Sequence, residues 1–256
     1  MLEIKGLACG YDSKFFLRDI NLKVNSGEFV GIIGPNGSGK TTLLRAVTRI
    51  LDVRQGEILL DGTNVKKMSY REISKKIAVV SQGTDVRFIT VEDFVLLGRL
   101  PHYRRFQFLE SKRDMEIARD CLTVTGIIKL SNQLMDEISS GEKQLAFIAR
   151  ALAQEPELLL LDEPTAHLDI THQVGILSLI RKLNKEMGLT VIVVLHDLNL
   201  AGEYCDRLVL LNNGRLHKSG SPVEVLTYET IEDVYKTRVV TGENPVTTRP
   251  HIFLVT

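Results

Sequence analysis

The sequence has 256 residues, and its 32 lysine and arginine residues are balanced by 32 aspartate and glutamate residues. A chain of this length buries about three quarters of its unfolded surface, which is enough for one α/β domain with a smaller subdomain. The zero net charge provides no field for nucleic acid or anionic lipid, and no apolar run approaches the ~18 residues that a membrane span requires. Any membrane role must therefore come through a partner.

The first residues and the cysteines indicate the cellular compartment. Residues 1–5 lack the basic-then-apolar order of a secretory signal, so we expect none. Cys9, Cys121 and Cys205 are an odd number without Cys-x-x-Cys spacing. This usage suits a reducing cytoplasm and thiols that are packed or idle.

Three strands are expected in the first part of the chain. Residues 2–11 alternate apolar and polar side chains as a half-buried strand does, and further strands are expected near 19–24 and 28–33. Tyr11 follows a glycine, and its ring could stack on a purine. The residue alone is better explained as a core or surface tyrosine.

The third strand leads into a loop with the spacing Gly-x-x-x-x-Gly-Lys-Thr, which is typical of phosphate-binding P-loops. The candidate nucleotide-binding residues are Gly34, Pro35, Asn36, Gly37, Ser38, Gly39, Lys40, Thr41 and Thr42. Glycines open φ values closed to other residues, so successive N–H groups can form an anion-binding nest at a helix start. Lys40 would bridge the β- and γ-phosphates of a nucleotide, and the Thr41 hydroxyl would coordinate Mg²⁺. The full spacing disfavours the alternative of an ordinary glycine-rich turn.

Two more strands are expected after the P-loop helix, at residues 56–62 and 77–80. Gln82 lies just past the second of these. Ligands of open parallel sheets bind beyond the carboxyl ends of the strands, so its amide could reach Mg²⁺ or an attacking water. Without other motifs, Gln82 is more simply a polar residue at a strand end.

Residues from 91 to about 153 have helical periodicity, interrupted by a basic and aromatic stretch at 99–106. Pro101 is expected to keep this stretch from forming a helix. Its charges and rings suit either a solvated loop or a protein contact surface. Arg99 is the first basic residue of this stretch.

A second segment with anion-binding character precedes the helix that is expected to begin after Ile138. Ser139, Ser140 and Gly141 would present hydroxyl and free N–H groups there, although the simpler interpretation is a good helix cap. A chain with two anion-binding helix starts has either two ligands or one ligand shared between two subunits. The segment alone leaves both open.

Two carboxylates follow a run of four leucines. Residues 158–161 are expected to form a fully buried parallel strand, with Asp162 and Glu163 at its active-site end. Successive side chains of a strand point to opposite sides, so the two acids should do different work. Asp162 suits a Mg²⁺ ligand, direct or through water, and Glu163 suits the group that polarises water for attack on the γ-phosphate. Residues 184–187 do not match the guanine-reading motif Asn-Lys-x-Asp.

The last apolar strand, at residues 189–195, ends at His196 and Asp197. His196 could hydrogen-bond a γ-phosphate and sense its loss, although alone it is as readily structural. Asp197 is predicted to cap the helix that begins at Leu198. Residues 237–256 contain short apolar alternation, so we expect them to be ordered.

The order of these motifs along most of the chain resembles the ATP-binding subunit of an ABC transporter. Tyr11 matches the adenine-stacking position of that family, residues 34–42 match the Walker A loop, and Gln82 matches the Q-loop.

The second half of the chain continues the resemblance. Residues 139–142 match the signature motif, with Ser-Ser-Gly-Glu where Ser-Gly-Gly-Gln is commonest, and residues 158–162 match Walker B. Glu163 matches the catalytic glutamate, residues 166–169 the D-loop, and His196 the switch histidine. Ser139 and Gly141 are retained, so we expect the γ-phosphate contact to survive the departure from the common motif.

The resemblance implies an α/β fold of the P-loop NTPase (RecA-like) type. It would have a mixed sheet core, an N-terminal antiparallel β subdomain, and an inserted α-helical subdomain at about residues 90–155. The ATP-binding domain would span residues 1–230, and residues 231–256 would form a C-terminal extension packed on it. The implied catalytic residues are Glu163, His196 and Gln82, and the implied Mg²⁺ ligands are Thr41, Gln82 and Asp162.

The resemblance also implies partners. Two copies would pair head to tail, with Ser139 and Gly141 of each facing the nucleotide of the other, and closure of the dimer by ATP would move integral-membrane permease subunits. The segment 90–153 would dock on the permease at the cytoplasmic face of the membrane, and a substrate-binding protein would take part indirectly.

Finer similarity concerns the cargo: three segments, 91–102, 195–201 and 242–251, resemble importers of iron-siderophore complexes, haem and vitamin B12. The alternative is a soluble ABC-type ATPase that acts on nucleic acid or ribosomes. Such proteins usually carry two cassettes or a long coiled-coil insertion, and neither fits within this chain. The zero net charge also gives no footprint for a phosphate backbone, so we expect no nucleic acid partner.

Overall fold

A computed structural model describes residues 1–11, 16–81, 86–104, 107 and 109–255 of the chain. The chain divides into two compact units. The first contains Met1–Met68 and Leu183–Thr256, and the second contains Ser69–Lys182. The expected domain boundaries, at residue 230 and around residues 90–155, stay predictions.

The first unit contains a four-stranded antiparallel sheet in the order β2-β1-β4-β5. Its strands are β1 (Leu2–Cys9), β2 (Leu17–Val24), β4 (Gln55–Leu60) and β5 (Thr63–Asn64). Buried and exposed residues largely alternate along β2, as in a strand with one face in the core. The strand expected near 19–24 thus begins earlier, at Leu17.

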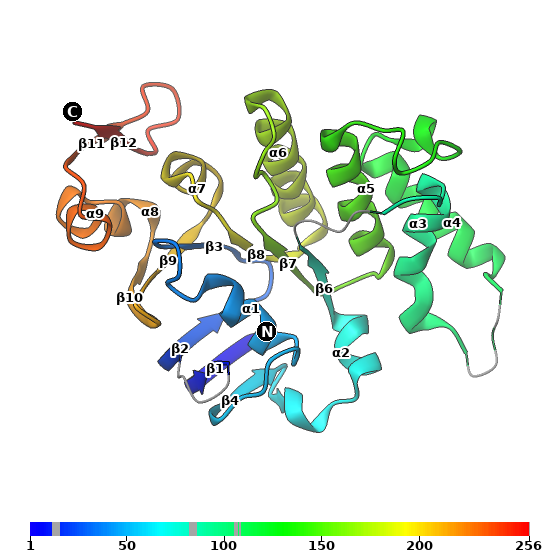
Figure 1. The fold of residues 1–256 in the computed structure, drawn as a ribbon, viewed down its shortest axis with the longest axis horizontal. Helices are drawn as coiled ribbons and strands as arrows, with labels where there is room; N and C mark the ends of the chain where they lie inside the picture. Colours follow the sequence, from blue (N-terminus) through cyan, green and yellow to red (C-terminus); the bar gives the residue numbers. More distant parts are fainter. Residues whose placement is uncertain (12–15, 82–85, 105–106, 108, 256) are drawn as a thin grey trace. The chain divides into compact units, whose positions relative to one another are not determined.

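The same unit contains a mixed sheet in which strands β10, β9, β3 and β8 follow one another. Figure 1 shows β3 (Phe29–Ile33) between β8 (Thr190–Val194) and β9 (Arg207–Asn212), and it pairs in parallel with both. The strand β10 (Arg215–Gly220) pairs antiparallel with β9. Every residue of β3 and β8 is buried, because parallel strands of this kind are covered on both faces.

The helices of the first unit lie between and after these strands. They are α1 (Lys40–Val47), the 3-10 turn η1 (Val65–Lys67), α7 (Leu198–Tyr204), α8 (Pro222–Val225) and α9 (Tyr228–Tyr235). The side chain of Asp197 accepts hydrogen bonds from the N–H groups of Asn199 and Leu200, so it caps α7 as its position predicts. Ordered structure was expected near the C-terminus, and the chain forms a hairpin there from β11 (Val239–Glu243) and β12 (Pro250–Leu254).

The second unit combines two parallel strands with a helical group. The strands β6 (Ile77–Val80) and β7 (Leu158–Asp162) pair in register from Ile77 and Leu158. Figure 1 shows α3 (Val91–Leu96), α4 (Lys112–Val124) and α5 (Ser140–Ala153) grouped together. The remaining elements are α2 (Tyr70–Lys76), η2 (Leu97–His102), η3 (Ile128–Leu130) and the first part of α6 (Ile170–Met187), within which the division between the units falls.

Aromatic packing joins the helices of this group. The rings of Phe94 and Phe147 meet edge to face with centroids 5.0 Å apart, and the Arg150 guanidinium lies 4.9 Å from the Phe94 centroid. Leu122 and Ile148 are fully buried beside other apolar residues of the core. The segment is less continuously helical than its periodicity suggests, because 3-10 turns and irregular segments separate α3, α4 and α5.

The fold class is confirmed. An antiparallel sheet is formed by the N-terminal strands, a mixed sheet carries the P-loop, and helices complete the α/β architecture. No helix among the described residues has both the length and the apolar character needed to cross a membrane. Burial raises the pKa of Cys9 to about 11 and that of Cys121 to about 12, so these two thiols stay protonated at neutral pH.

Candidate nucleotide-binding site

The backbone of the P-loop adopts conformations that require glycine. Gly34 has φ 147° and Gly39 has φ 106°. A Cβ at Gly34 would lie 2.2 Å from the Leu211 carbonyl oxygen, and one at Gly39 would lie 2.5 Å from the Leu17 Cδ2. Both positions therefore combine left-handed backbone with a space that a side chain would fill. Gly37 is also left-handed, with φ 77°, but faces open space.

The start of α1 is arranged to hold an anion. The helix begins at Lys40, and its cap Gly39 provides no side chain to cover the first N–H groups. The Lys40 Nζ donates to the carbonyl oxygens of Gly34, at 2.8 Å, and Pro35, at 3.1 Å, so the cation is held directly over the loop. The buried Ser38 Oγ has no hydrogen-bond partner among the described residues. These groups fit the phosphates of a nucleotide.

The threonines at the start of α1 complete the P-loop sequence. Thr41 is half-buried and Thr42 is buried. A hydroxyl directly after the P-loop lysine is the kind of oxygen ligand that Mg²⁺ takes together with phosphates and water. Among the described residues, no three histidine, cysteine or acidic side chains gather into a self-contained metal site. The Thr41 hydroxyl has the chemistry of a Mg²⁺ ligand, and its role as one stays a prediction.

His196 lies at the same edge of the mixed sheet as the P-loop. Ile32 of β3 pairs with Val194 of β8, and the Leu195 N–H donates to the Ile32 carbonyl at 3.1 Å. His196 follows directly and is exposed. Because the carboxyl ends of parallel strands share one edge, Gly34 and His196 emerge on the same side of the sheet.

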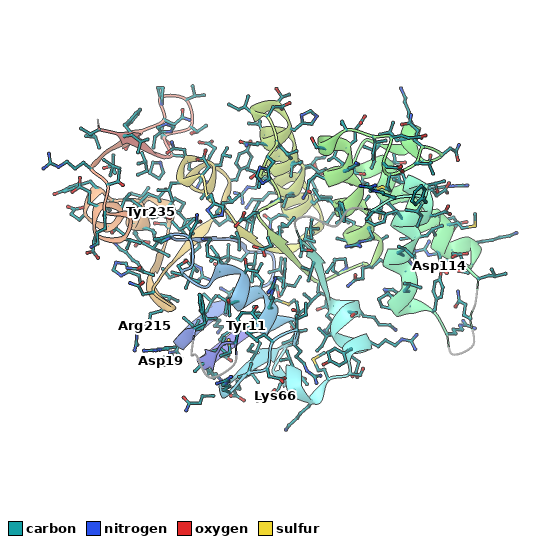
Figure 2. All side chains as sticks on the ribbon, in the orientation of Figure 1. Tyr11, Asp19, Lys66, Asp114, Arg215 and Tyr235 are labelled. Carbon is teal, nitrogen blue, oxygen red and sulfur yellow. The ribbon has the colours of Figure 1, made fainter. Side chains whose placement is uncertain are left out.

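Tyr11 presents a partly exposed ring in the first unit (Figure 2). Tyr11 follows β1 in the chain, and the Arg45 Nη1 of α1 donates to its hydroxyl at 2.7 Å. This contact ties the tyrosine to the P-loop helix. The adenine-stacking role of Tyr11 stays a prediction.

The acidic residues lie at the carboxyl end of β7 in the second unit. Val80 of β6 pairs with Leu161 of β7, so Asp162 emerges beside Ser81 at the ends of the two strands. Glu163 leaves the strand with φ 53°, a left-handed turn that directs its side chain differently from that of Asp162. Both side chains are half-buried. Gln82 lies outside the described residues.

The signature segment caps α5. The Ser139 Oγ accepts from the Glu142 N–H at 3.3 Å and donates to the Glu142 Oε2 at 2.7 Å, while the Ser139 N–H donates to the same carboxylate at 2.8 Å. These hydrogen bonds from Ser139 lower the pKa of Glu142. The glutamate of Ser-Ser-Gly-Glu therefore forms a complete capping box.

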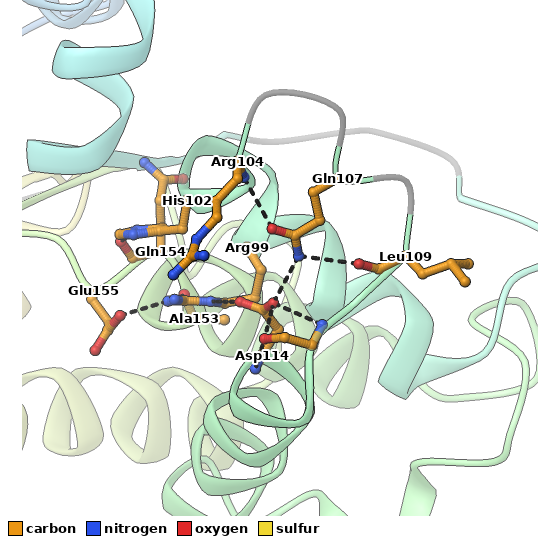
Figure 3. A network of polar contacts seen from close by, with 10 residues as sticks. Arg99, His102, Arg104, Gln107, Leu109, Asp114, Ala153, Gln154 and Glu155 are labelled. Carbon is orange, nitrogen blue, oxygen red and sulfur yellow. Dashed lines mark hydrogen bonds and ion pairs between the residues drawn. The ribbon is translucent and has the colours of Figure 1, made fainter.

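Arg99 departs from the exposed position expected for the basic stretch at 99–106, whose role as a solvated loop or contact surface stays a prediction. Its side chain is 5% exposed, and it donates through Nε to the Asp114 Oδ1 at 3.0 Å and through Nη1 to the Ala153 carbonyl at 2.6 Å and the Glu155 Oε2 at 2.7 Å (Figure 3). Arg99 is thus a buried structural residue. Pro101 lies inside η2, because a 3-10 turn tolerates the missing N–H, and residues 105–106 lie outside the described part of the chain.

The sequence did not predict the contacts that three side chains make at this site. Arg45 contacts Tyr11, Tyr235 of α9 (labelled in Figure 2) is hydrogen-bonded to the Gly34 backbone, and His172 contacts Gly141. Only His172 had a local signal, because its position three residues after Asp169 is that of a residue facing a helix cap. The other contacts join segments that are distant in sequence.

The parallel strands and the glycine loop define a P-loop nucleotide-binding protein.

Comparison with known proteins identifies the family. Residues 17–166 match the ABC transporter family. The chain is 39% identical to the ferric enterobactin transport ATP-binding protein FepC of Escherichia coli, over 95% of this chain and 90% of the relative. It is also 39% identical to the petrobactin import ATP-binding protein FpuC of Bacillus anthracis, over 92% and 86% of the two chains. The chain belongs to the ABC transporter family, as an ATP-binding subunit with ATPase activity.

Solved structures agree with this assignment. A metal-chelate type ABC transporter in an inward-facing conformation superposes with a TM-score of 0.87 at 28% identity, over 100% of this chain and 97% of that chain. A dimeric ATP-binding cassette bound to ADP and phosphate superposes with a TM-score of 0.76 at 31% identity, over 87% and 99% of the two chains.

Proposed function

We propose that this chain is the energy-coupling subunit of an importer that takes up an iron chelate (siderophore), haem or a cobalamin. The observation that carries the proposal is the P-loop geometry in a chain whose relatives include ATP-binding proteins of petrobactin and ferric enterobactin import. Another relative, 38% identical over 96% of this chain, is the cobalamin import ATP-binding protein BtuD of Halobacterium salinarum.

Nucleotide binding is assigned to the residues of the predicted motifs. The P-loop N–H groups and Lys40 hold the phosphates, and Tyr11 stacks on adenine. Thr41, Gln82 and Asp162 would hold Mg²⁺, which when bound would supply charge neutralisation at the phosphates. Glu163 orients and polarises the attacking water, and His196 contacts the γ-phosphate.

Two copies of the chain pair head to tail in this proposal. Each copy offers a P-loop and a signature segment, and Ser139 and Gly141 face the nucleotide held by the other copy. The dimeric cassette with ADP and phosphate supports this arrangement. Closing and opening of the dimer are transmitted to permease subunits at the cytoplasmic face of the membrane, and a substrate-binding protein supplies the cargo.

Replacing Glu163 tests the assigned chemistry. Glu163→Gln keeps the shape of the side chain but removes the carboxylate, so ATP should bind, trap a dimer and turn over at least about 100-fold more slowly. Dimer formation is measured by size-exclusion chromatography with ATP, and turnover by phosphate release. Glu116→Gln on the exposed face of α4 is the matched control, with unchanged turnover. Normal hydrolysis by the Glu163 variant would remove this residue from its role.

Co-purification tests the transport assignment. The tagged chain is isolated from gently solubilised native membranes, and the proteins bound to it are identified. Recovery of a polytopic permease of the iron-chelate or cobalamin type would support import. Comparing the cellular uptake of labelled ferric chelate with that of labelled cobalamin would then identify the cargo. Ribosomal or DNA-repair partners without a membrane protein would contradict the proposal.

A further inference from the structure

His172, in the first turn of α6, is fixed by the residue that caps this helix. The His172 N–H donates to the Asp169 Oδ1 at 2.9 Å, and the ring Nδ1 lies 2.9 Å from both Asp169 carboxylate oxygens. The backbone and side-chain hydrogen bonds from His172 lower the pKa of Asp169. The imidazole therefore has one orientation, with a proton on Nδ1 directed at the carboxylate.

The opposite edge of the same ring lies on the signature segment. A Cβ at Gly141 would be 2.2 Å from the His172 Cδ2 and 2.6 Å from its Nε2, distances at which no side chain fits. Gly141 is not among the glycines with positive φ, so its backbone conformation is open to other residues. A larger residue at this position would have to displace the imidazole, because the ring approaches the helix backbone closely.

The residue after His172 holds the preceding loop as well. The Gln173 Nε2 donates to the Leu168 carbonyl at 2.9 Å and to the Thr165 carbonyl at 3.3 Å. The first turn of α6 is thus hydrogen-bonded to the backbone of residues 163–169, which we call the Asp169 loop. Through His172 the same turn also touches the start of α5.

We propose that His172 is a positioning residue that locks the Asp169 loop to the signature segment, so that both segments of one copy meet a nucleotide as a single rigid piece. His172 lies beyond the residues 17–166 that match the family, and nothing in that match assigns it a role. The proposal rests on the proposed function in one respect, which is that the signature segment contacts the nucleotide of a second copy. Two segments that are already fixed to each other lose less conformational freedom when the dimer closes than two segments that move independently.

The packing part of the proposal is tested by a double-mutant cycle on the isolated chain. Gly141→Ala forces a methyl group into the ring and should lower the thermal unfolding midpoint by about 3 °C or more. In the His172→Ala background the space is open, and the same substitution should change the midpoint by less than about 1 °C. Equal losses in both backgrounds would overturn the proposed contact.

The positioning part is tested by nucleotide-driven dimerisation. In the Glu163→Gln background, His172→Ala should raise the ATP concentration for half-maximal dimer formation at least about fivefold. Binding of a fluorescent ATP analogue to the monomer should change less than about twofold, because the P-loop is untouched. A purely structural defect would weaken both measurements together, and that result, or a dimerisation shift below twofold, would overturn the proposal.

His217→Ala is the matched control. His217 on β10 also faces a carboxylate, with its Nε2 3.7 Å from the Asp233 Oδ2, and its side chain is 35% exposed against 44% for His172. Dimerisation of this variant should be unchanged. If the Glu163→Gln chain itself fails to dimerise with ATP, the proposed head-to-tail function fails, while the unfolding cycle still decides whether His172 locks the two segments.

Discussion

Replacing Arg99 with methionine should destabilise the protein strongly, because its guanidinium is the hub of a buried polar network (Figure 3). Arg99→Met keeps the length of the side chain but leaves the Asp114 carboxylate, which is 8% exposed, without its cation. It also leaves the Ala153 carbonyl without the donor that now lies at 2.6 Å. The change therefore removes charge compensation and a buried hydrogen bond together.

The expected loss is about 3 kcal/mol of unfolding free energy. Breaking a buried ion pair by removing one partner costs about 3–5 kcal/mol. Asp114 keeps hydrogen bonds from the Ser111 N–H, at 3.0 Å, and Oγ, at 2.6 Å, which places this site at the lower end of that range. The third partner, Glu155, has a half-exposed side chain and recovers its hydration when released, so it adds little.

Urea unfolding followed by far-ultraviolet circular dichroism measures this loss, since the chain has no tryptophan. Arg104→Met is the matched control, because Arg104 belongs to the same segment but is exposed; its unfolding free energy should change by at most about 0.5 kcal/mol. In the Asp114→Asn background, Arg99→Met should cost less, since no buried charge is left behind. A loss below about 1 kcal/mol for Arg99→Met alone would refute the reasoning and return Arg99 to a surface role.

Three other changes test the structure. Burial alone would raise the pKa of Asp114, but hydrogen bonds from Ser111 and Arg99 lower it from 3.8 to about 2. The stabilisation that the ionised Asp114 provides is therefore complete above about pH 4 and is lost as the pH falls toward 2. Over this range the urea midpoint of the parent protein should fall more steeply than that of Asp114→Asn. Gly39→Ala should abolish ATP binding, measured by calorimetry, because the new methyl group meets Leu17 at a backbone φ of 106°; retained affinity would show that the loop can rearrange. Tyr235→Phe removes only the hydroxyl bonded to the Gly34 backbone, so ATP affinity should fall about threefold with an unchanged unfolding midpoint, and an unchanged affinity would leave α9 with a packing role alone.

Local sequence predicted the elements whose chemistry is local. The glycines and Lys40 of the P-loop are recognisable because a phosphate nest needs a fixed spacing over a few residues, and the buried strands at 77–80 and 158–161 are recognisable because parallel strands exclude polar side chains. The predicted cap at Asp197 is confirmed for the same reason. The functional roles proposed for these residues came from the order of motifs and stay predictions, since strand-end residues such as His196 carry no distinctive signal alone.

The tertiary structure decided the contacts between segments that are distant in sequence. Arg99 looked like part of a basic surface because its neighbours are polar, yet its hydrogen-bond partner Ala153 lies 54 residues away and helix packing buries both. Gly141 was predicted only as part of an anion-binding helix start, and the structure adds that the ring of His172 on another helix lies where a side chain at this position would be. A sequence specifies backbone preference and hydrophobic period locally, but which side chains a residue finally touches depends on how the elements pack, and that packing determines whether a charge is buried or exposed.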